Sequence, residues 1–396
     1  MNTSSFKSVF GATLLITGCC IGAGMIGLPV RTAMAGFVSS TVATIFCYIF
    51  TTITGLLILE ATLWFEEKVN FSTIVESILG KKGKFITLFL FLALFYSLFV
   101  AYLDGCGIIF SDIVSSLTGY AVPKYIGIIL CVSLVAAITY AGTHMANRFN
   151  QLLLLGLIIT YFALIVIGLQ HVNILKTSQV DFMSILNVVP IMLICFGYQN
   201  LVPSITYYLN KNVNHIRFAI IIGNFIPLLV YMLWNYVILG ILPADASIKN
   251  AELVTQLLGG SMSVISIIFL VKSFSLFALL TSFIPTAISL VDFIKDSAKN
   301  SLHKKISNDM FYIAIIFIPS FIFTLIYPNL FLNMLDFAGG FVDVLLFGLM
   351  PATVVLLGRK TIASAPYKVI GGKVTPILIL LFSFMILLIK TGVVHA

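Results

Sequence analysis

The sequence predicts an all-α polytopic membrane protein, and three observations support this fold class. Hydrophobic residues make up 60% of the 396 residues and charged residues only 9%, whereas a soluble domain averages about 25% charged residues. The chain contains repeated apolar runs of about 20 residues, the length of a helix that crosses the roughly 30 Å hydrocarbon core of a bilayer. These runs are continuous and do not alternate, so a transmembrane β-barrel does not fit.

Eleven apolar segments follow one another along the chain and predict eleven transmembrane helices. They cover residues 9–30, 35–61, 86–111, 122–142, 150–170, 183–208, 216–240, 263–292, 310–327, 331–357 and 374–391. The joining segments are short, and the longest polar ones lie at 62–85 and 293–309. No linker is long enough to separate domains, so we expect a single transmembrane domain over residues 1–396.

The 22 Lys and Arg residues explain the net charge of +8 as membrane topology. With a cytoplasmic N-terminus, 16 of them fall on the cytoplasmic side, 5 fall on the outer side, and Lys272 lies inside a segment. This asymmetry follows the positive-inside rule and argues against nucleic acid as a partner. We expect an integral protein of the plasma membrane, or of the inner membrane in a bacterium, with the C-terminus outside.

The first segment contains the stretch GCCIGAGMIGLPV, in which Gly22, Gly24 and Gly27 spell G-x-G-x-x-G before Pro29. A dinucleotide site needs a preceding strand, a following helix and an acidic residue about twenty positions on. Here a membrane span precedes the glycines, a proline follows them, and the region near 46–50 has no acid. We therefore expect a broken helix whose free amide and carbonyl groups bind a ligand's carboxylate and ammonium.

The sixth segment has a matching interruption at Gly197-Tyr198-Gln199-Asn200, followed by Pro203. The two interrupted segments are five apart, which predicts a five-plus-five inverted repeat with broken helices 1 and 6. Its parts are repeat 1 at about 8–170, repeat 2 at about 183–358, and an additional C-terminal helix at about 374–391. The alternative is that the glycines only allow helices to pack closely.

Several stretches together resemble the aromatic amino acid permeases (tyrosine, tryptophan) of the amino acid–polyamine–organocation superfamily. They are GAGMIGLP in helix 1, AYLDGCG in helix 3, CFGYQNLVPS in helix 6, LFALLTSF in helix 8 and FAGGF in helix 10. The resemblance covers essentially the full length. It implies a LeuT-like fold and a secondary active transporter that imports tyrosine or tryptophan with a proton by alternating access. The breaks in helices 1 and 6 are then expected to hold the substrate's α-amino and α-carboxyl groups.

The predicted substrate site combines both breaks with aromatic residues from two other helices. It consists of Ile21, Gly22, Ala23, Gly24, Met25 and Gly27 in helix 1, Phe196, Gly197, Tyr198, Gln199 and Asn200 in helix 6, Tyr102 in helix 3 and Phe277 in helix 8. Stacking on a bound ring contributes about 0.5–1.5 kcal/mol beyond area burial, which favours an aromatic substrate. It does not separate tyrosine from tryptophan; a phenol would need a hydrogen-bond partner such as Gln199 or Asn200.

The coupling ion is expected to be a proton, as the resemblance implies, with sodium as the alternative. Thr281 and Ser282 in helix 8 resemble the position at which sodium-coupled relatives with this fold ligate an ion against helix 1 carbonyls. The alternative function is therefore a sodium-coupled symporter for another neutral amino acid, using an ion site between helices 1 and 8.

Three ionisable residues inside the membrane are candidates for coupling: Asp104 in helix 3, Lys272 in helix 8 and Asp343 in helix 10. Such residues are costly in a bilayer and usually face a cavity or a partner. We expect Lys272 to pair with Asp104 or Asp343. Asp104 and Asp343 also depart from the pattern of the resembled family. Glu60 and Asp292 lie near cytoplasmic ends, where we expect them to be solvated.

Other function classes find little support in the sequence. No re-entrant filter segment is repeated four times, as a channel would require, and neither H-E-x-x-H nor G-x-S-x-G is present, so an enzyme is not expected. The six cysteines lie in apolar stretches without C-x-x-C, so we expect packing residues and no zinc site. The expected partners are an amino acid, a proton or sodium, and lipids, with no cofactor or metal; we expect a monomer.

Overall fold

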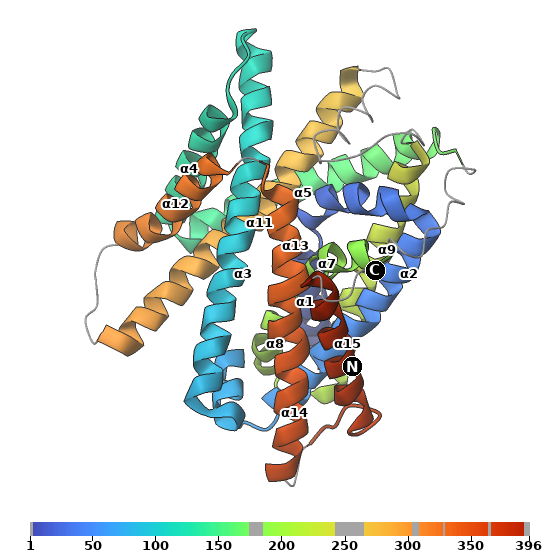
Figure 1. Cartoon of the computed structure of the whole chain (residues 1–396), viewed down its shortest axis with the longest axis vertical. Coiled ribbons are helices and arrows are strands. Elements are labelled where there is room, and N and C mark those ends of the chain that lie inside the picture. The colour runs from blue at the N-terminus through green and yellow to red at the C-terminus, as the bar shows by residue number, and fades with distance from the viewer. Residues whose placement is uncertain are drawn as a thin grey trace.

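The computed structural model describes residues 3–173, 185–241, 265–302, 309–327, 329–362 and 366–391. Within these residues all regular structure is helical, as the sequence predicts (Figure 1). The N-terminal part contains α1 (Thr3–Cys20), α2 (Gly24–Thr62), α3 (Phe71–Thr118), α4 (Lys124–Tyr140) and α5 (Thr143–Leu169). The C-terminal part contains α7 (Ile185–Cys195), η1 (Gln199–Leu201), α8 (Val202–Tyr208), α9 (Val213–Ile241), α11 (Ile265–Leu302), α12 (Asp309–Ile326), α13 (Phe331–Phe337), η2 (Ala338–Leu349), α14 (Met350–Thr361) and α15 (Val374–Lys390).

The described helices supply seven candidate membrane spans, or eight if the bent pair Lys7–Cys20 and Gly24–Ala33 forms one span. Three shorter apolar helices lie at Lys124–Tyr140, Met310–Ile326 and Val374–Lys390. Each of the eleven predicted segments overlaps one of these helices, so the helical class is confirmed. The count of eleven spans and the inverted repeat stay predictions.

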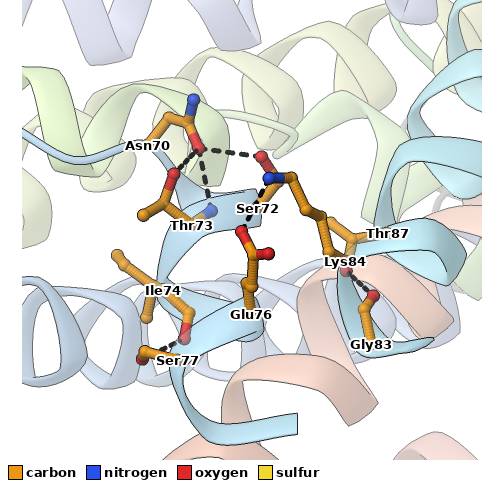
Figure 2. Close-up of polar contacts among 9 residues, drawn as sticks. All are labelled: Asn70, Ser72, Thr73, Ile74, Glu76, Ser77, Gly83, Lys84 and Thr87. Carbon is orange, nitrogen blue, oxygen red and sulfur yellow. Dashed lines mark hydrogen bonds and ion pairs between the residues drawn. The ribbon is translucent and has the colours of Figure 1, made fainter. Parts of the chain in front are cut away.

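The predicted polar loop at 62–85 is wrong from residue 71 on, because α3 begins at Phe71. The Asn70 side chain caps the helix by accepting the Thr73 N–H (Figure 2), as short polar residues do at helix N-termini. Gly80, with φ of 69°, then bends the helix in a conformation that suits glycine. Lys84 and Glu76 form an ion pair across this bend (Figure 2). Residues 71–79 mix apolar and polar side chains, and a lysine-rich stretch separates them from the continuous apolar run at 86–111, so the run alone does not include them.

The helices form two packing groups, and one span contacts both of them. In the first group, α2 packs on α7 and α9, and α1 packs on α9. In the second group, α3 packs on α4 and α11, and α11 packs on α5. The span made by α13, η2 and α14 runs beside α3 and also contacts α2 and α7 (Figure 1), and α15 packs on η2. Both broken helices therefore belong to the first group, and α11 reaches them from the second.

An aromatic cluster holds the second group together. The Phe99 ring of α3 lies edge-on to Phe283 of α11, with 4.6 Å between centroids, and edge-on to Phe317 of α12, at 4.8 Å. Edge-to-face pairs at these distances are favourable beyond their buried area. The cluster fixes α11 against α3 next to the residues of α11 that face the first break.

Candidate functional site

The first break separates α1, which ends at Cys20, from α2, which begins at Gly24. The two helical pieces are bent by 54° relative to one another. Between them the Ala23 N–H leaves the helical pattern and donates to the Ser282 hydroxyl oxygen of α11, at 3.0 Å. The glycine run therefore interrupts the helix where the sequence predicts, and an amide of the first packing group finds its partner in the second.

The second break follows Cys195, the last residue of α7. Phe196 to Tyr198 are not helical, and a single 3₁₀ turn at Gln199–Leu201 leads into α8. Pro203 lies in the first turn of α8, where its missing N–H is tolerated. The predicted interruption of the sixth segment is thus confirmed as well.

The two breaks lie against one another, as predicted. A Cβ placed on Gly24 would overlap the Cys195 Sγ and approach the Cys195 Cα to 3.6 Å, so only glycine fits this approach. On the other side of the contact, the Cys19 Sγ–H donates to the Gly197 carbonyl at 3.3 Å. The C-terminal ends of α1 and α7, which carry partial negative charge, therefore meet near the N-terminal end of α2, which carries partial positive charge. Such a meeting of helix ends suits a zwitterion.

Two side chains of α9 hold the ends of the broken helices. The Tyr231 hydroxyl contacts the carbonyls of Cys20 and Cys195, the latter at 3.0 Å. The Trp234 indole N–H donates to the Met25 carbonyl at 3.0 Å. In an unbroken helix this carbonyl would accept the N–H of residue 29, but Pro29 has none. Trp234 thus satisfies an acceptor that the sequence itself leaves free.

Sequence reasoning missed Tyr231 and Trp234, although a signal exists. Asn224, Tyr231 and Asn235 are spaced by seven and four residues, so they share one face of an otherwise apolar helix. Asn224 donates to Thr51 and Thr52 of α2, and Asn235 accepts from Thr32. A polar stripe of this kind in a membrane segment predicts contact with other helices rather than with lipid.

Of the two predicted helix 8 oxygens, only Ser282 faces the first break. The Thr281 hydroxyl donates to carbonyls of its own helix, Phe277 at 2.8 Å and Ala278 at 3.1 Å. The Ser282 oxygen accepts an amide N–H of helix 1, whereas the sodium hypothesis placed helix 1 carbonyls opposite this pair. Ser282 therefore forms a hydrogen bond between the two packing groups. The contacts of Thr281 and Ser282 do not form the set of oxygen ligands that a sodium site needs.

The polar and aromatic residues of the second break point mostly into the protein. Phe196, Tyr198 and Gln199 are buried, and Asn200 is exposed. The Tyr198 hydroxyl donates to the Thr51 carbonyl of α2 at 3.0 Å, and the Gln199 Oε1 has no hydrogen-bond partner. Of these side chains, Gln199 is the one that retains an unused buried acceptor.

The remaining predicted residues divide between the break and the surrounding helices. Tyr102 lies beside the hydroxyls of Ser282 and Thr286, which places it next to the first break. Phe277 instead packs on α5, where a Cβ on Gly156 would approach its ring to 2.7 Å. Ala23, Met25 and Gly27 are buried, while Ile21 and Gly24 are half-buried. The structure therefore gathers the helix 1 residues and Tyr102 at the first break, whereas the Phe277 ring packs on α5.

The intramembrane charges pair differently from the prediction. Lys272 does not bind Asp104 or Asp343; it pairs with Asp112, two turns beyond Asp104 on α3, at 2.9 Å. Asp104 is 1% exposed and pairs with Lys124 at the start of α4, at 2.6 Å. Asp104 also accepts the Phe331 N–H at the start of α13, at 3.2 Å. Both its oxygens are thus used, which suits a fixed link between α3, α4 and α13.

Asp343 has a different environment. It lies on η2, a stretch of π-helix that begins with Ala338, Gly339 and Gly340. Its side chain is 3% exposed, and its Oδ1 makes no hydrogen bond. A carboxylate buried without a cation or donor is strongly disfavoured in its charged form. Among the three predicted coupling residues, Asp343 is therefore the one whose geometry suits a carboxyl that binds a proton.

Two further ion pairs join α2 to the span made by α13, η2 and α14. Near the first break, Arg31 pairs with Asp336 of α13. At the other end of α2, Glu60 is fully buried and binds Arg359 of α14 through both carboxylate oxygens, each at 2.6 Å. The expectation that Glu60 is solvated is wrong, because Arg359 folds back over the end of α2. Asp292 is exposed, as expected.

All six cysteines are free, and five are buried, as expected of packing residues. Cys19 departs from that expectation because it is exposed. It lies one residue before the end of α1, and its thiol contacts the second break. Cys19 is therefore an accessible thiol at the contact between the two breaks, where a reagent could modify it.

Comparison with known proteins finds amino acid transporters that match nearly the whole chain. The model of the tryptophan/tyrosine permease family matches residues 5–390. Tyrosine-specific transport system 1 of Haemophilus influenzae is 29% identical over 390 residues, covering 95% of this chain and 94% of the relative. The tryptophan-specific transport protein of Pseudomonas aeruginosa is 29% identical over 395 residues, covering 95% and 92%. Glutamine transporter 2 of Aliivibrio fischeri is 26% identical over 400 residues, covering 97% and 99%.

Proposed function

The chain belongs to the tryptophan/tyrosine permease family, and from this premise we propose that it imports tyrosine or tryptophan by proton symport with alternating access. It is an integral membrane protein, with seven to eight candidate spans among the described residues. Its relatives are named as transport proteins, in agreement with the prediction of a transporter rather than an enzyme. The substrate, the coupling ion and the transport cycle are the parts that this proposal adds.

The observation that carries the proposal is the contact between the two breaks. Gly24 and Cys195 touch where α1 and α7 end and α2 begins. An amino acid carries its ammonium and its carboxylate on the same carbon atom, and helix C-terminal and N-terminal ends favour these two charges respectively. This pairing supports a substrate site at the breaks, with the ring lying toward Tyr102.

The environments of the ionisable and hydroxyl side chains favour a proton over sodium as the coupling ion. The buried Asp343 carboxyl has an oxygen without a partner, and protonation would remove the cost of its charge. The sodium alternative relies on Thr281 and Ser282, of which Thr281 bonds to its own helix. We therefore propose Asp343 as the residue that carries the proton, and Asp104 as a structural partner of Lys124.

The proposed topology follows the distribution of Lys and Arg. It places the N-terminus in the cytoplasm and the C-terminus outside, in the plasma membrane of the cell, or the inner membrane of a bacterium. The proposed domain is a single transporter unit with repeats at about 8–170 and 183–358, in which broken helices 1 and 6 occupy equivalent positions. We propose that a monomer is the working unit.

The test is uptake of labelled tyrosine and tryptophan into proteoliposomes that contain the purified full chain. A pH gradient and a sodium gradient are imposed separately. The proposal expects concentrative uptake under an inward proton gradient and none under sodium alone. Because one relative is named a glutamine transporter, glutamine is included as a competitor. Uptake that follows only the sodium gradient would support the alternative, and failure to concentrate either aromatic amino acid would overturn the proposal.

A further inference from the structure

Tyr231 lies on α9, outside both broken helices, and is fully buried. Its hydroxyl contacts the carbonyls of Cys20 and Cys195, which are the last residues of α1 and α7. Its ring packs edge-on against Phe196 in the second break, with 5.3 Å between centroids. One side chain of a third helix thus holds the ends of both half-helices at a common point.

Around the Tyr231 hydroxyl, the carbonyl acceptors outnumber the hydroxyl donors. Two carbonyls and the Cys195 thiol surround the Tyr231 hydroxyl. A tyrosine hydroxyl has one proton to donate, so the two carbonyls share a single hydroxyl donor. The backbone N–H groups of Ile21, Met25 and Gly197 bond to other carbonyls, and the Ala23 N–H bonds to the Ser282 hydroxyl. One acceptor is therefore left available for a further donor. Because both carbonyls lie at negatively polarised helix ends, a positively charged donor fits best.

Trp234 fixes the other side of the first break from the same helix. Its indole N–H donates to Met25, the second residue of α2. Together Tyr231 and Trp234 span the break, since one contacts the last carbonyl of α1 and the other a carbonyl of α2. The position of the Cys20 carbonyl is thus set by α9 rather than by the broken helix itself.

We infer that Tyr231 is a positioning residue for the amino group of the substrate. It holds the Cys20 and Cys195 carbonyls together, donates its proton to one, and leaves the other to accept from the substrate's ammonium. The inference rests on the proposed function, since it assumes that an amino acid binds at the breaks. Beyond the proposed function, it gives a role in substrate binding to a residue outside the two broken helices, and it names the substrate's ammonium as the group affected.

The test compares Tyr231→Phe with Tyr96→Phe in the purified full chain. Both changes remove a hydroxyl that donates to a backbone carbonyl, but Tyr96 of α3 bonds to Ile315 of α12, in the second packing group. Competition against labelled L-tyrosine is measured with L-tyrosine and with 3-(4-hydroxyphenyl)propionate, which lacks the amino group. We expect the affinity ratio of the two competitors to shrink roughly tenfold in Tyr231→Phe and to stay at the wild-type value in Tyr96→Phe.

A second measurement needs no ligand. Hydrogen–deuterium exchange of the amides at 20–24 and 195–199 is expected to be faster in Tyr231→Phe than in the wild type and in Tyr96→Phe, because the hydroxyl that contacts both breaks is gone. If the competitor ratio stays unchanged, or exchange at the breaks does not differ, the inference is wrong even if the wild type transports tyrosine. If the wild type binds neither tyrosine nor tryptophan, the proposed function fails first and the inference fails with it.

Discussion

Glu60 and Arg359 are separated by 299 positions in the chain and form a two-point ion pair between the end of α2 and the end of α14. Glu60 also accepts the Val369 N–H at 2.7 Å, and Arg359 donates to the Gly372 carbonyl. The carboxylate and the guanidinium therefore attach the segment that joins α14 to α15 to the end of α2. This contact connects the helix that follows the first break with the span that carries Asp343.

Replacing Glu60 with Gln should destabilise the protein strongly. The change leaves the Arg359 guanidinium without its counter-charge, and removing one partner of a buried ion pair costs about 3–5 kcal/mol. The matched control is Glu76→Gln, whose partner Lys84 lies in a half-exposed pair near the surface that contributes about 1 kcal/mol or less. Thermal unfolding in detergent compares the two. Equal melting temperatures for both variants would show that the Glu60 pair adds no stability.

Replacing Gly24 with Ala should impair transport by pushing the breaks apart. The added Cβ overlaps the Cys195 Sγ, and overpacking of this kind costs about 1–3 kcal/mol. A second change, Cys195→Ala, removes the sulfur and leaves the Cys195 Cβ at 3.5 Å, an ordinary contact. We therefore expect the double variant to recover most of the uptake that Gly24→Ala loses. Absence of recovery would mean that this contact does not explain the need for glycine.

Ser282 and Thr281 are adjacent but should respond differently to loss of the hydroxyl. Ser282→Ala removes the acceptor of the Ala23 N–H, and an unsatisfied buried donor costs about 1–3 kcal/mol. We expect the KM for uptake to rise roughly fivefold or more. Thr281→Val only removes a bond within its own helix and should leave KM near the wild-type value. A sodium site formed by both oxygens predicts similar losses for both variants.

Asp343→Asn should uncouple transport from the proton gradient. An amide cannot bind the proton, so uptake should no longer increase when the outside is acidified. Exchange of labelled for unlabelled substrate needs no net proton movement and should persist. Asp104→Asn is the comparison, because Asp104 is occupied by Lys124 and the Phe331 N–H. Acid stimulation that survives in Asp343→Asn and disappears in Asp104→Asn would assign the proton to Asp104 instead.

Cys19 should be the cysteine that reacts with a thiol reagent, since the other five are buried. A small methanethiosulfonate reagent should label the wild type once and leave Cys19→Ser unlabelled. Because the thiol contacts the Gly197 carbonyl, saturating tyrosine or tryptophan should slow the reaction if substrate binds at the breaks. Labelling that is equally fast with and without both amino acids would place the substrate elsewhere.

The sequence predicted both breaks because their signals are local. Gly22, Gly24 and Pro29 interrupt one apolar run, and Gly197 and Pro203 interrupt another. A proline removes one backbone donor and glycines adopt non-helical dihedrals easily, so these residues weaken the helix at their own positions, whatever lies beside it. The start of α3 was missed because its first turns mix apolar and polar residues and a lysine-rich stretch separates them from the apolar run at 86–111.

Partners of the charged residues could not be predicted in this way. Lys272 had two plausible carboxylates by position along the chain, Asp104 and Asp343, and it binds a third, Asp112. Position along a segment gives the depth of a side chain in the membrane but not its direction. An apolar helix can rotate about its axis without exposing anything less apolar, so the pattern does not select the face that meets a neighbour.

By itself the sequence determined that this chain is a helical membrane protein, where its helices break, and which family it resembles, because run length, glycines and prolines act within a single segment. Only the tertiary structure decided that Tyr231 bridges the two breaks, that Ser282 and not Thr281 faces the first, and that Glu60 is buried under Arg359. These contacts depend on the rotation and register of helices far apart in the chain, which packing alone sets.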